Sequence, residues 1–240
     1  KLAETALMAA LCYVSFTFLQ IKIPVPGGDA TSIHIGNAFC VLAALLIGGV
    51  YGGLSGAIGM GIADLMDPVY ITGAPKTFVL KFCIGLITGL VAHKIAKINE
   101  STDKKYVFKW SVIASVAGLA FNVVADPIVG YFYKQYILGQ PQELAQALAK
   151  MSAVATLFNA VVSVILVAVI MAYVVFLKKD IFKPLRVLMV FLASGAIGNM
   201  IDRFTKGYVV DMFDFKLIHF PVFNVADIYV TCSVIIGMIL

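Results

Sequence analysis

Two short motifs near the C-terminus each contain an asparagine followed three residues later by an aspartate. Asn199 and Asp202 form the first pair, and Asn224 and Asp227 form the second. Residues three apart on a helix share a face, so each motif would present both side chains together. Each motif also stands at the end of a long apolar run, where an ionisable group is costly and usually functional. Two such carboxylates indicate the chemistry of an aspartic hydrolase inside a membrane.

That chemistry needs one protonated and one ionised carboxyl group with a water molecule between them. Two carboxylates held close together repel, so the pair shares one proton near neutral pH. The structural alternative is that Asp202 caps a helix and pairs with its neighbour Arg203. Because the motif occurs twice, we favour Asp202 and Asp227 as a catalytic pair that titrates jointly.

The composition is that of a membrane protein. Hydrophobic residues make up 61% of the 240 residues and charged residues only 13%, and the mean hydropathy is +0.98. A soluble domain of this size would need more charge on its surface. The net charge of +5 does not require a nucleic-acid partner, because the basic residues lie at predicted helix ends. The four cysteines have no paired spacing, so we expect packing residues rather than a disulfide or a zinc site. No metal or other cofactor is expected.

Eight apolar runs predict an all-α, polytopic membrane protein with about eight transmembrane helices. The second and third runs are rich in glycine and could form one tightly packed hairpin. Polar loop 134–150 is expected to be partly helical, and loop 204–221 to contain a short strand or an interfacial segment. The approximate ranges of the runs are 5–23, 38–50, 52–67, 76–97, 108–133, 151–177, 185–203 and 222–240.

Basic residues predict the orientation of these helices. Lysine and arginine concentrate in two linkers, 94–109 and 178–186, which we therefore expect to be cytoplasmic. Both termini would then be cytoplasmic as well. The loops 24–36, 68–75, 134–150 and 204–221 would face outward, and Asp202 and Asp227 would lie near the outer face.

The N-terminal part resembles the S components of energy-coupling-factor (ECF) vitamin transporters. The resemblance covers about 170 residues and is strongest in residues 24–28, 31–39, 63–68 and 74–78. It implies a six-helix bundle that binds a vitamin-like small molecule from outside, with the first outer loop as a lid. It also implies docking onto an ECF coupling subunit that two ATPases drive. The chain contains no Walker sequence, so ATP hydrolysis in this chain is not expected.

Polar residues in or beside the outer halves of these helices are the candidate ligand contacts, because intramembrane ionisable groups are usually functional. Structural alternatives exist for several positions. Asp67 precedes a proline and could cap a turn, Lys76 and Lys81 could extend toward the lipid surface, and His34 could be a surface residue. The candidates are His34, Asn37, Asp64, Lys81, Asn122, Asp126 and Asn159.

The first helix offers a candidate docking face. Ala6 and Ala10 lie four residues apart, a spacing of small residues that lets helices approach closely. The resemblance implies that the coupling subunit docks here. The alternative is ordinary packing within the bundle.

The C-terminal motifs resemble those of lipoprotein signal peptidase (signal peptidase II). The matching segments are 195–203, 207–211, 213–215 and 220–227, in the family's order and spacing. The resemblance implies that Asp202 and Asp227 are catalytic, that Asn199 and Asn224 support them, and that Arg203 lies at the lipid head groups. The implied substrate is a diacylglyceryl-modified prolipoprotein held in membrane lipid. We identify no counterpart of the peptidase's first half in residues 1–170.

The sequence therefore predicts two parts in a bacterial cytoplasmic membrane. Residues 1–177 would be an S-component-like binding domain and residues 178–240 half of a peptidase. A transport protein and a membrane aspartic endopeptidase both remain open as functions. The join could be a natural fusion, an engineered chimera or an artefact, and we expect both chain ends to be truncated.

Overall fold

The computed structural model describes residues 1–25, 29–177, 182–206, 208–213 and 222–239. Parts of the sequence motifs lie outside this range, including residues 26–28, the basic pair 178–179, and residues 207, 214–215 and 220–221. The chain separates into two compact units, unit 1 (Lys1–Leu177) and unit 2 (Lys178–Leu240). Each unit is described by itself.

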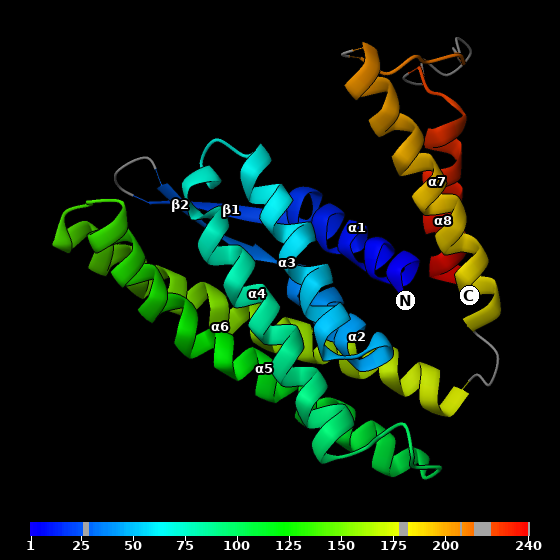
Figure 1. Ribbon diagram of the computed structural model, residues 1–240, viewed down its shortest axis with the longest axis horizontal. Helices are drawn as coiled ribbons and strands as arrows, with labels where there is room; N and C mark the ends of the chain where they lie inside the picture. The colour runs from blue at the N-terminus through cyan, green and yellow to red at the C-terminus, as the bar shows by residue number, and fades with distance from the viewer. Residues whose placement is uncertain (26–28, 178–181, 207, 214–221, 240) are drawn as a thin grey trace. The chain divides into compact units, whose positions relative to one another are not determined.

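The described residues form eight α-helices, six in unit 1 and two in unit 2 (Figure 1). A 3₁₀ turn, η1 (Ile71–Gly73), precedes α4, and π-helical turns extend α4, α5 and α6 at their C-terminal ends: η2 (Leu90–Ile95), η3 (Tyr133–Ile137) and η4 (Tyr173–Leu177). The helical class predicted from the sequence is confirmed. The helices are α1 (Leu2–Phe18), α2 (Gly36–Ile47), α3 (Gly49–Met66), α4 (Ala74–Gly89), α5 (Lys104–Phe132), α6 (Gln142–Ala172), α7 (Phe182–Lys206) and α8 (Val225–Ile239).

Three continuous helical stretches in the described residues are long and apolar enough to cross a membrane: Ile71–Ile95, Lys104–Ile137 and Gln142–Phe176. Leu2–Phe18, Gly36–Ile47 and Val225–Gly237 are apolar but shorter. The predicted run 5–23 is cut short because the chain leaves the helix at Leu19. The break after Ile47 comes from Gly48, whose φ of 101° is a conformation that glycine adopts without strain.

An antiparallel hairpin lies between α1 and α2, where the sequence suggested the end of a helix and a loop. Its strands are β1 (Gln20–Val25) and β2 (Asp29–His34). Alternation explains why these residues form strands: the pair Ile21 and Ile33 lies on one face, and the pair Lys22 and Ser32 on the other. Six alternating residues directly after an apolar helix are too few to stand out in the sequence.

Glycines bring α2, α3 and α4 into backbone contact. A Cβ added to Gly52 would lie 2.3 Å from the Cα of Ala44 in α2, and one added to Gly85 would lie 2.2 Å from the backbone nitrogen of Gly53. A Cβ on Gly89 would lie 2.1 Å from the Cα of Gly49. Small residues allow this close approach, and the predicted tight hairpin of the second and third runs is confirmed as α2 and α3.

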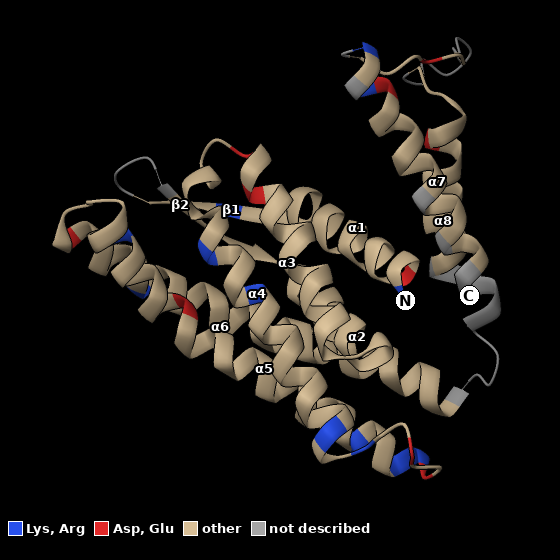
Figure 2. Ribbon diagram, viewed as in Figure 1, with Lys and Arg blue, Asp and Glu red and all other residues tan. Residues whose placement is uncertain are grey.

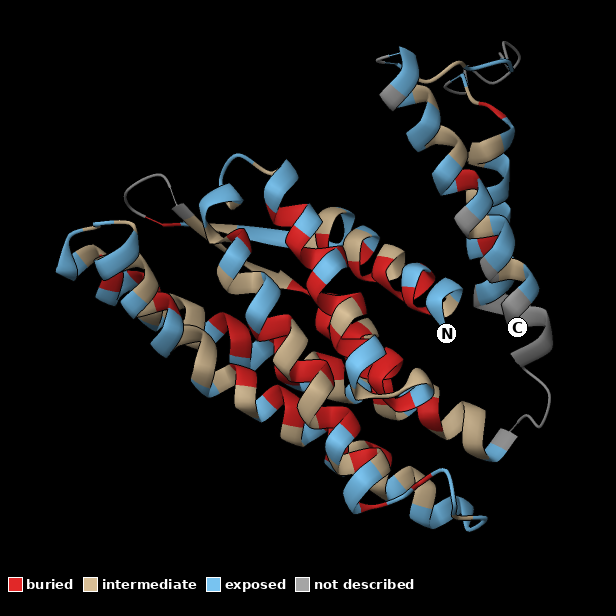
Figure 3. Ribbon diagram, viewed as in Figure 1, coloured by how far each residue is buried: buried red, intermediate tan, exposed pale blue. Residues whose placement is uncertain are grey.

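The core of unit 1 lies where its helices face one another, and the buried segments follow these inner faces in Figure 3. Charged residues gather mainly at helix ends (Figure 2). In unit 2, α7 packs on α8 at Gly195, where an added Cβ would lie 2.4 Å from the carbonyl oxygen of Ala226. The strand expected in loop 204–221 reduces to a single bridge between Phe213 and Phe223 in the described residues.

The helix contacts at Gly85 lead to a stability prediction. Gly85→Ala places a methyl group against the backbone of Gly53, which cannot move aside as a side chain could. We expect this substitution to lower the free energy of unfolding by about 2 kcal/mol or more. The control is Gly73→Ala, because an added Cβ there has no atom beyond its chain neighbours within 4 Å; its change should stay within about 0.5 kcal/mol. Denaturation in mixed micelles measures both, and equal losses would contradict the packing described.

Candidate ligand pocket and carboxylate cluster

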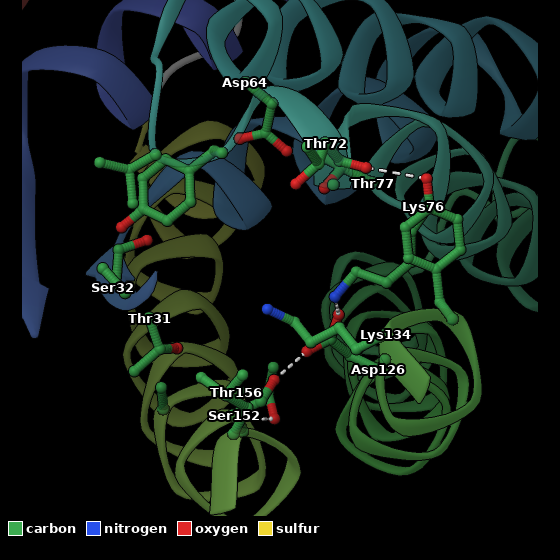
Figure 4. Close-up of a pocket in the computed structure, with 18 of the residues that line it drawn as sticks. Thr31, Ser32, Asp64, Thr72, Lys76, Thr77, Asp126, Lys134, Ser152 and Thr156 are labelled. Carbon is green, nitrogen blue, oxygen red and sulfur yellow. Dashed lines mark hydrogen bonds and ion pairs between the residues drawn. The ribbon is translucent and has the colours of Figure 1, made fainter. Parts of the chain in front are cut away.

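A cavity of unit 1, called the ligand cavity below, lies between the hairpin and the helices α3 to α6 (Figure 4). Strand β2, the C-terminal part of α3, η1, α4, α5, η3 and α6 all contribute side chains. Five of the seven ligand contacts predicted from the sequence line this cavity: His34, Asp64, Lys81, Asp126 and Asn159. Residues up to 143 positions apart in the chain therefore meet at one site, as the span from Phe16 to Asn159 shows.

Asn37 and Asn122, the other two predicted contacts, are buried but do not line the cavity. The side-chain oxygen of Asn37 accepts a hydrogen bond of 2.9 Å from the Nζ of Lys81. Lys81 is only 8% exposed, so the alternative that it extends toward the lipid surface is wrong. The Oδ1 atom of Asn122 has no hydrogen-bond partner among the described residues.

An ion pair between Lys76 and Asp126 crosses the cavity. The Nζ of Lys76 lies 2.8 Å from the Oδ1 of Asp126, and the hydroxyl of Ser152 donates to the Oδ2 of the same carboxylate. Both charged side chains are about 15% exposed. Figure 4 shows these three side chains meeting inside the cavity, so Lys76 does not extend outward as the sequence allowed. The cluster joins α4, α5 and α6.

Asn159 attaches the hairpin to α6. Its Oδ1 accepts a hydrogen bond of 3.0 Å from the backbone nitrogen of His34, and its Nδ2 donates one of 3.0 Å to the carbonyl oxygen of Ser32. The amide thus takes the place of a neighbouring strand along the free edge of β2. Asn159 is therefore a positioning group for the hairpin as well as a cavity residue.

His34 is 6% exposed, so the surface alternative is wrong. Its Nδ1 accepts a hydrogen bond of 3.2 Å from the backbone nitrogen of Gly36, and its ring meets that of Phe16 edge-on at 4.6 Å between centroids. Burial, and then the nearby ammonium of Lys81, lower the pKa of His34 well below its usual value. The imidazole is therefore neutral at physiological pH.

A second attachment holds β1 to the end of α3. Lys22 forms an ion pair with Asp67, and its Nζ lies 5.3 Å from the ring centre of Tyr70. Asp67 also accepts a hydrogen bond of 3.1 Å from the backbone nitrogen of Val69, which confirms the turn predicted before Pro68. The hairpin is therefore held at both edges over the cavity.

The cavity combines aromatic walls with many hydrogen-bonding groups. Phe16, Tyr70 and Tyr133 line it together with lysines, aspartates and hydroxyl groups, among them Thr77 and Thr156. No cluster of three or more metal-binding side chains occurs in the described residues. Such a lining suits a small molecule that has both a flat apolar part and several polar groups.

Unit 2 contains a hydrogen-bonded cluster around Asp227. The Nδ2 of Asn199 donates to the Oδ1 of Asp227 at 2.7 Å, and the backbone nitrogen of Asn224 donates to its Oδ2 at 3.0 Å. The Nδ2 of Asn224 donates to the Oδ1 of Asn199 at 2.9 Å. The two asparagines predicted to support the carboxylates are thus brought together with Asp227.

Asp202 has different partners. Its Oδ1 lies 3.0 Å from the Nζ of Lys206, and its Oδ2 accepts a hydrogen bond of 3.2 Å from the backbone nitrogen of Val210. The pairing of Asp202 with Arg203 that the sequence allowed does not form, and Arg203 is exposed. Among the described residues, Asp202 and Asp227 share no hydrogen-bond partner.

A third carboxylate, Asp211, reaches this cluster, although the sequence analysis did not select it. Its Oδ1 accepts a hydrogen bond of 3.2 Å from the Nδ2 of Asn224. The only indication of this residue in the sequence is that an aspartate lies in the loop between the two Asn–Asp motifs. The bridge between Phe213 and Phe223 brings that loop back to the start of α8, and this return is not visible in the sequence.

The ion pair in unit 1 can be tested by a double-mutant cycle. Lys76→Met leaves the carboxylate of Asp126 buried without its cation, so we expect a loss of about 3 kcal/mol in the free energy of unfolding. Asp126→Asn removes the other charge and should also destabilise. The double variant should lose less than the sum of the single variants, because neither charge remains. Additive losses in micelle denaturation would mean that the two groups do not interact.

A scan against family models matches residues 1–176 to the ECF-type riboflavin transporter, S component. No solved structure matches. Among curated proteins, the lipoprotein signal peptidase of Latilactobacillus sakei subsp. sakei is 36% identical over 129 residues, 54% of this chain and 80% of that protein. The one from Brevibacillus brevis is 42% identical over 77 residues (32% and 50%), and the one from Microcystis aeruginosa is 58% identical over 45 residues (19% and 29%).

These matches correct one expectation. The 129-residue match is longer than unit 2, so it also includes part of unit 1. The expectation that residues 1–170 lack any peptidase counterpart is therefore wrong for part of that range. Apolar helices use few residue types and contain few distinctive motifs, so the similarity in this range is not apparent from motifs alone. The chain is also related to the lipoprotein signal peptidases. Through residues 1–176 it belongs to the S components of ECF-type riboflavin transporters, which are membrane-embedded, multi-pass proteins of vitamin uptake.

Proposed function

We propose that unit 1 binds riboflavin in the cavity between the hairpin and helices α3 to α6. The observation that supports this most strongly is the mixed aromatic and polar lining of that cavity. The lining occurs in a chain that matches the S component of riboflavin transporters. Riboflavin has a flat ring system with polar edges and a chain of hydroxyl groups. Aromatic side chains such as Phe16 and Tyr133 suit the ring, and the hydroxyl and amine groups of the lining suit the polar parts.

The charged groups of the cavity would act as binding groups rather than as catalysts. Lys76 and Asp126 neutralise each other, so together they offer a donor and an acceptor to a neutral ligand without leaving an isolated charge. The Nζ of Lys81 donates a hydrogen bond to the neutral amide of Asn37. A neutral, polar vitamin fits this environment better than a strongly charged one.

We further propose that the chain works with an ECF coupling subunit and two ATPases in a bacterial cytoplasmic membrane, with both termini on the cytoplasmic side. Ala6 is exposed and Ala10 is half-buried on α1, so the small-residue face is accessible in unit 1 as a docking surface requires. The basic residues around η2 and the start of α5 favour a cytoplasmic position for that end.

Riboflavin binding is tested by fluorescence titration of the full chain in detergent micelles. Ala149→Trp fills the cavity from α6, where Ala149 lines it, and should weaken riboflavin binding at least about tenfold. Leu157→Trp lies on the same helix but is 55% exposed and does not line the cavity, so its affinity should match the wild type. Wild-type chain that fails to bind riboflavin would refute the proposal, and so would equal affinities for the two variants.

A second function, endopeptidase activity on prolipoproteins, is supported by the cluster of unit 2 and by the similarity to lipoprotein signal peptidases. Asp227 would be one member of the catalytic pair. The sequence predicts Asp202 as the other member, and that stays a prediction. The hydrogen bonds favour Asp211, because Asn224 contacts both Asp211 and Asp227, whereas Asp202 is engaged by Lys206.

Three variants separate these assignments when the full chain, reconstituted in vesicles, is given a diacylglyceryl-modified prolipoprotein. Asp227→Asn and Asp211→Asn should each abolish cleavage, because a pair that shares a proton fails when either carboxyl group is lost. Asp202→Asn should retain cleavage and should not change riboflavin binding. Loss of cleavage in Asp202→Asn with normal cleavage in Asp211→Asn would restore the original assignment. Wild-type chain without cleavage would reject the peptidase function.

A further inference from the structure

A second cavity of unit 1 is a groove between the strands of the hairpin and α6. Its lining is almost entirely apolar, apart from one threonine and one lysine. The residues that line it are Ile23, Thr31, Ile33, Lys150, Met151, Val154, Ala155 and Phe158. None of the predicted ligand contacts is among them.

The two faces of the hairpin explain this lining. Ile23 and Ile33 lie on the same face because their partners across the ladder are Thr31 and Ile21. The opposite face carries Lys22, Ser32 and His34, which belong to the cavity and its attachments. The hairpin thus turns a polar face toward the ligand cavity and a mainly apolar face toward the groove, and Thr31 lines both.

The α6 side of the groove is a helical stripe in a membrane-spanning helix. Met151, Val154 and Phe158 are spaced by three and four residues and so share a face of α6. Val154 is 72% exposed and Phe158 is 50% exposed, although Gln142–Phe176 is apolar and long enough to cross a membrane. Side chains exposed on such a helix face lipid tails.

Lys150 marks one end of the groove and the depth at which it lies. No charged residue occurs between Met151 and Leu177, so Lys150 is the last charged side chain before the apolar part of α6. A lysine at this boundary extends its ammonium group to the level of the lipid head groups. The groove therefore begins at the head-group level and continues into the apolar layer.

We propose that this groove holds one acyl chain of a membrane phospholipid whose phosphate pairs with Lys150. The apolar lining matches the acyl chain, and the ammonium group at its end matches the phosphate charge. Thr31 and Ala155 line both the groove and the ligand cavity. The bound acyl chain therefore completes the wall that separates the ligand cavity from the membrane.

Native mass spectrometry of the full chain, titrated with palmitoyl-oleoyl phosphatidylglycerol in detergent, tests this proposal. The wild type should bind a single lipid with higher affinity than any further lipids. Val154→Trp fills the groove and should weaken that first binding at least about tenfold. The matched control is Val161→Trp. Val161 lies seven residues further along the same face of α6, is 52% exposed and does not line the groove. This variant should bind lipid as the wild type does.

The lysine is tested in the same titration. Lys150→Gln should weaken the first lipid severalfold, and Lys150→Arg should retain it, because arginine keeps the charge. Equal lipid binding by the wild type and Val154→Trp would overturn the proposal and would indicate adventitious lipid only. A wild-type dimer that Val154→Trp dissociates would also overturn it, because a second copy of the chain would then occupy the groove.

Discussion

The ion pair between Lys76 and Asp126 is the interaction on which the ligand cavity of unit 1 depends. It joins α4 to α5, and the hydroxyl of Ser152 extends it to α6. Charges with so little exposure persist only when they are paired, because an unpaired charge would be strongly destabilising. The three helices must therefore keep their relative depth, and this fixes where the remaining polar groups of the cavity lie. The charges stabilise the site and also supply its polarity.

The rest of unit 1 supports this arrangement. At the glycines, the backbones of α2, α3 and α4 are in direct contact. This contact fixes the position of α4, and with it the backbone positions of Lys76 and Lys81. The amide of Asn159 and the ion pair of Lys22 with Asp67 attach the hairpin at its two edges. The hairpin then presents Ser32 and His34 to the ligand cavity, and it presents Ile23 and Ile33 to the apolar groove. The hairpin thus forms one wall of the ligand cavity.

The sequence revealed the helical class and five of the cavity residues, because intramembrane polar groups such as Asp64 and Asn159 are rare and stand out. It missed Lys76 and the hairpin, since a lysine near a helix end and six alternating residues each have an ordinary explanation. In unit 2 it selected the asparagines that surround Asp227 but not Asp211, whose position depends on a chain reversal. Periodicity identifies elements and unusual residues, whereas partners on different helices emerge only when the helices are packed.

An experimental structure of the full chain with riboflavin present tests the central claim, that the vitamin binds beside the Lys76–Asp126 pair. The account predicts ligand density enclosed by β2, α4, α5 and α6, with the ion pair intact and the hairpin still held by Asn159. Riboflavin density elsewhere in the chain, or a cavity closed by side chains with Lys76 and Asp126 separated, would contradict it.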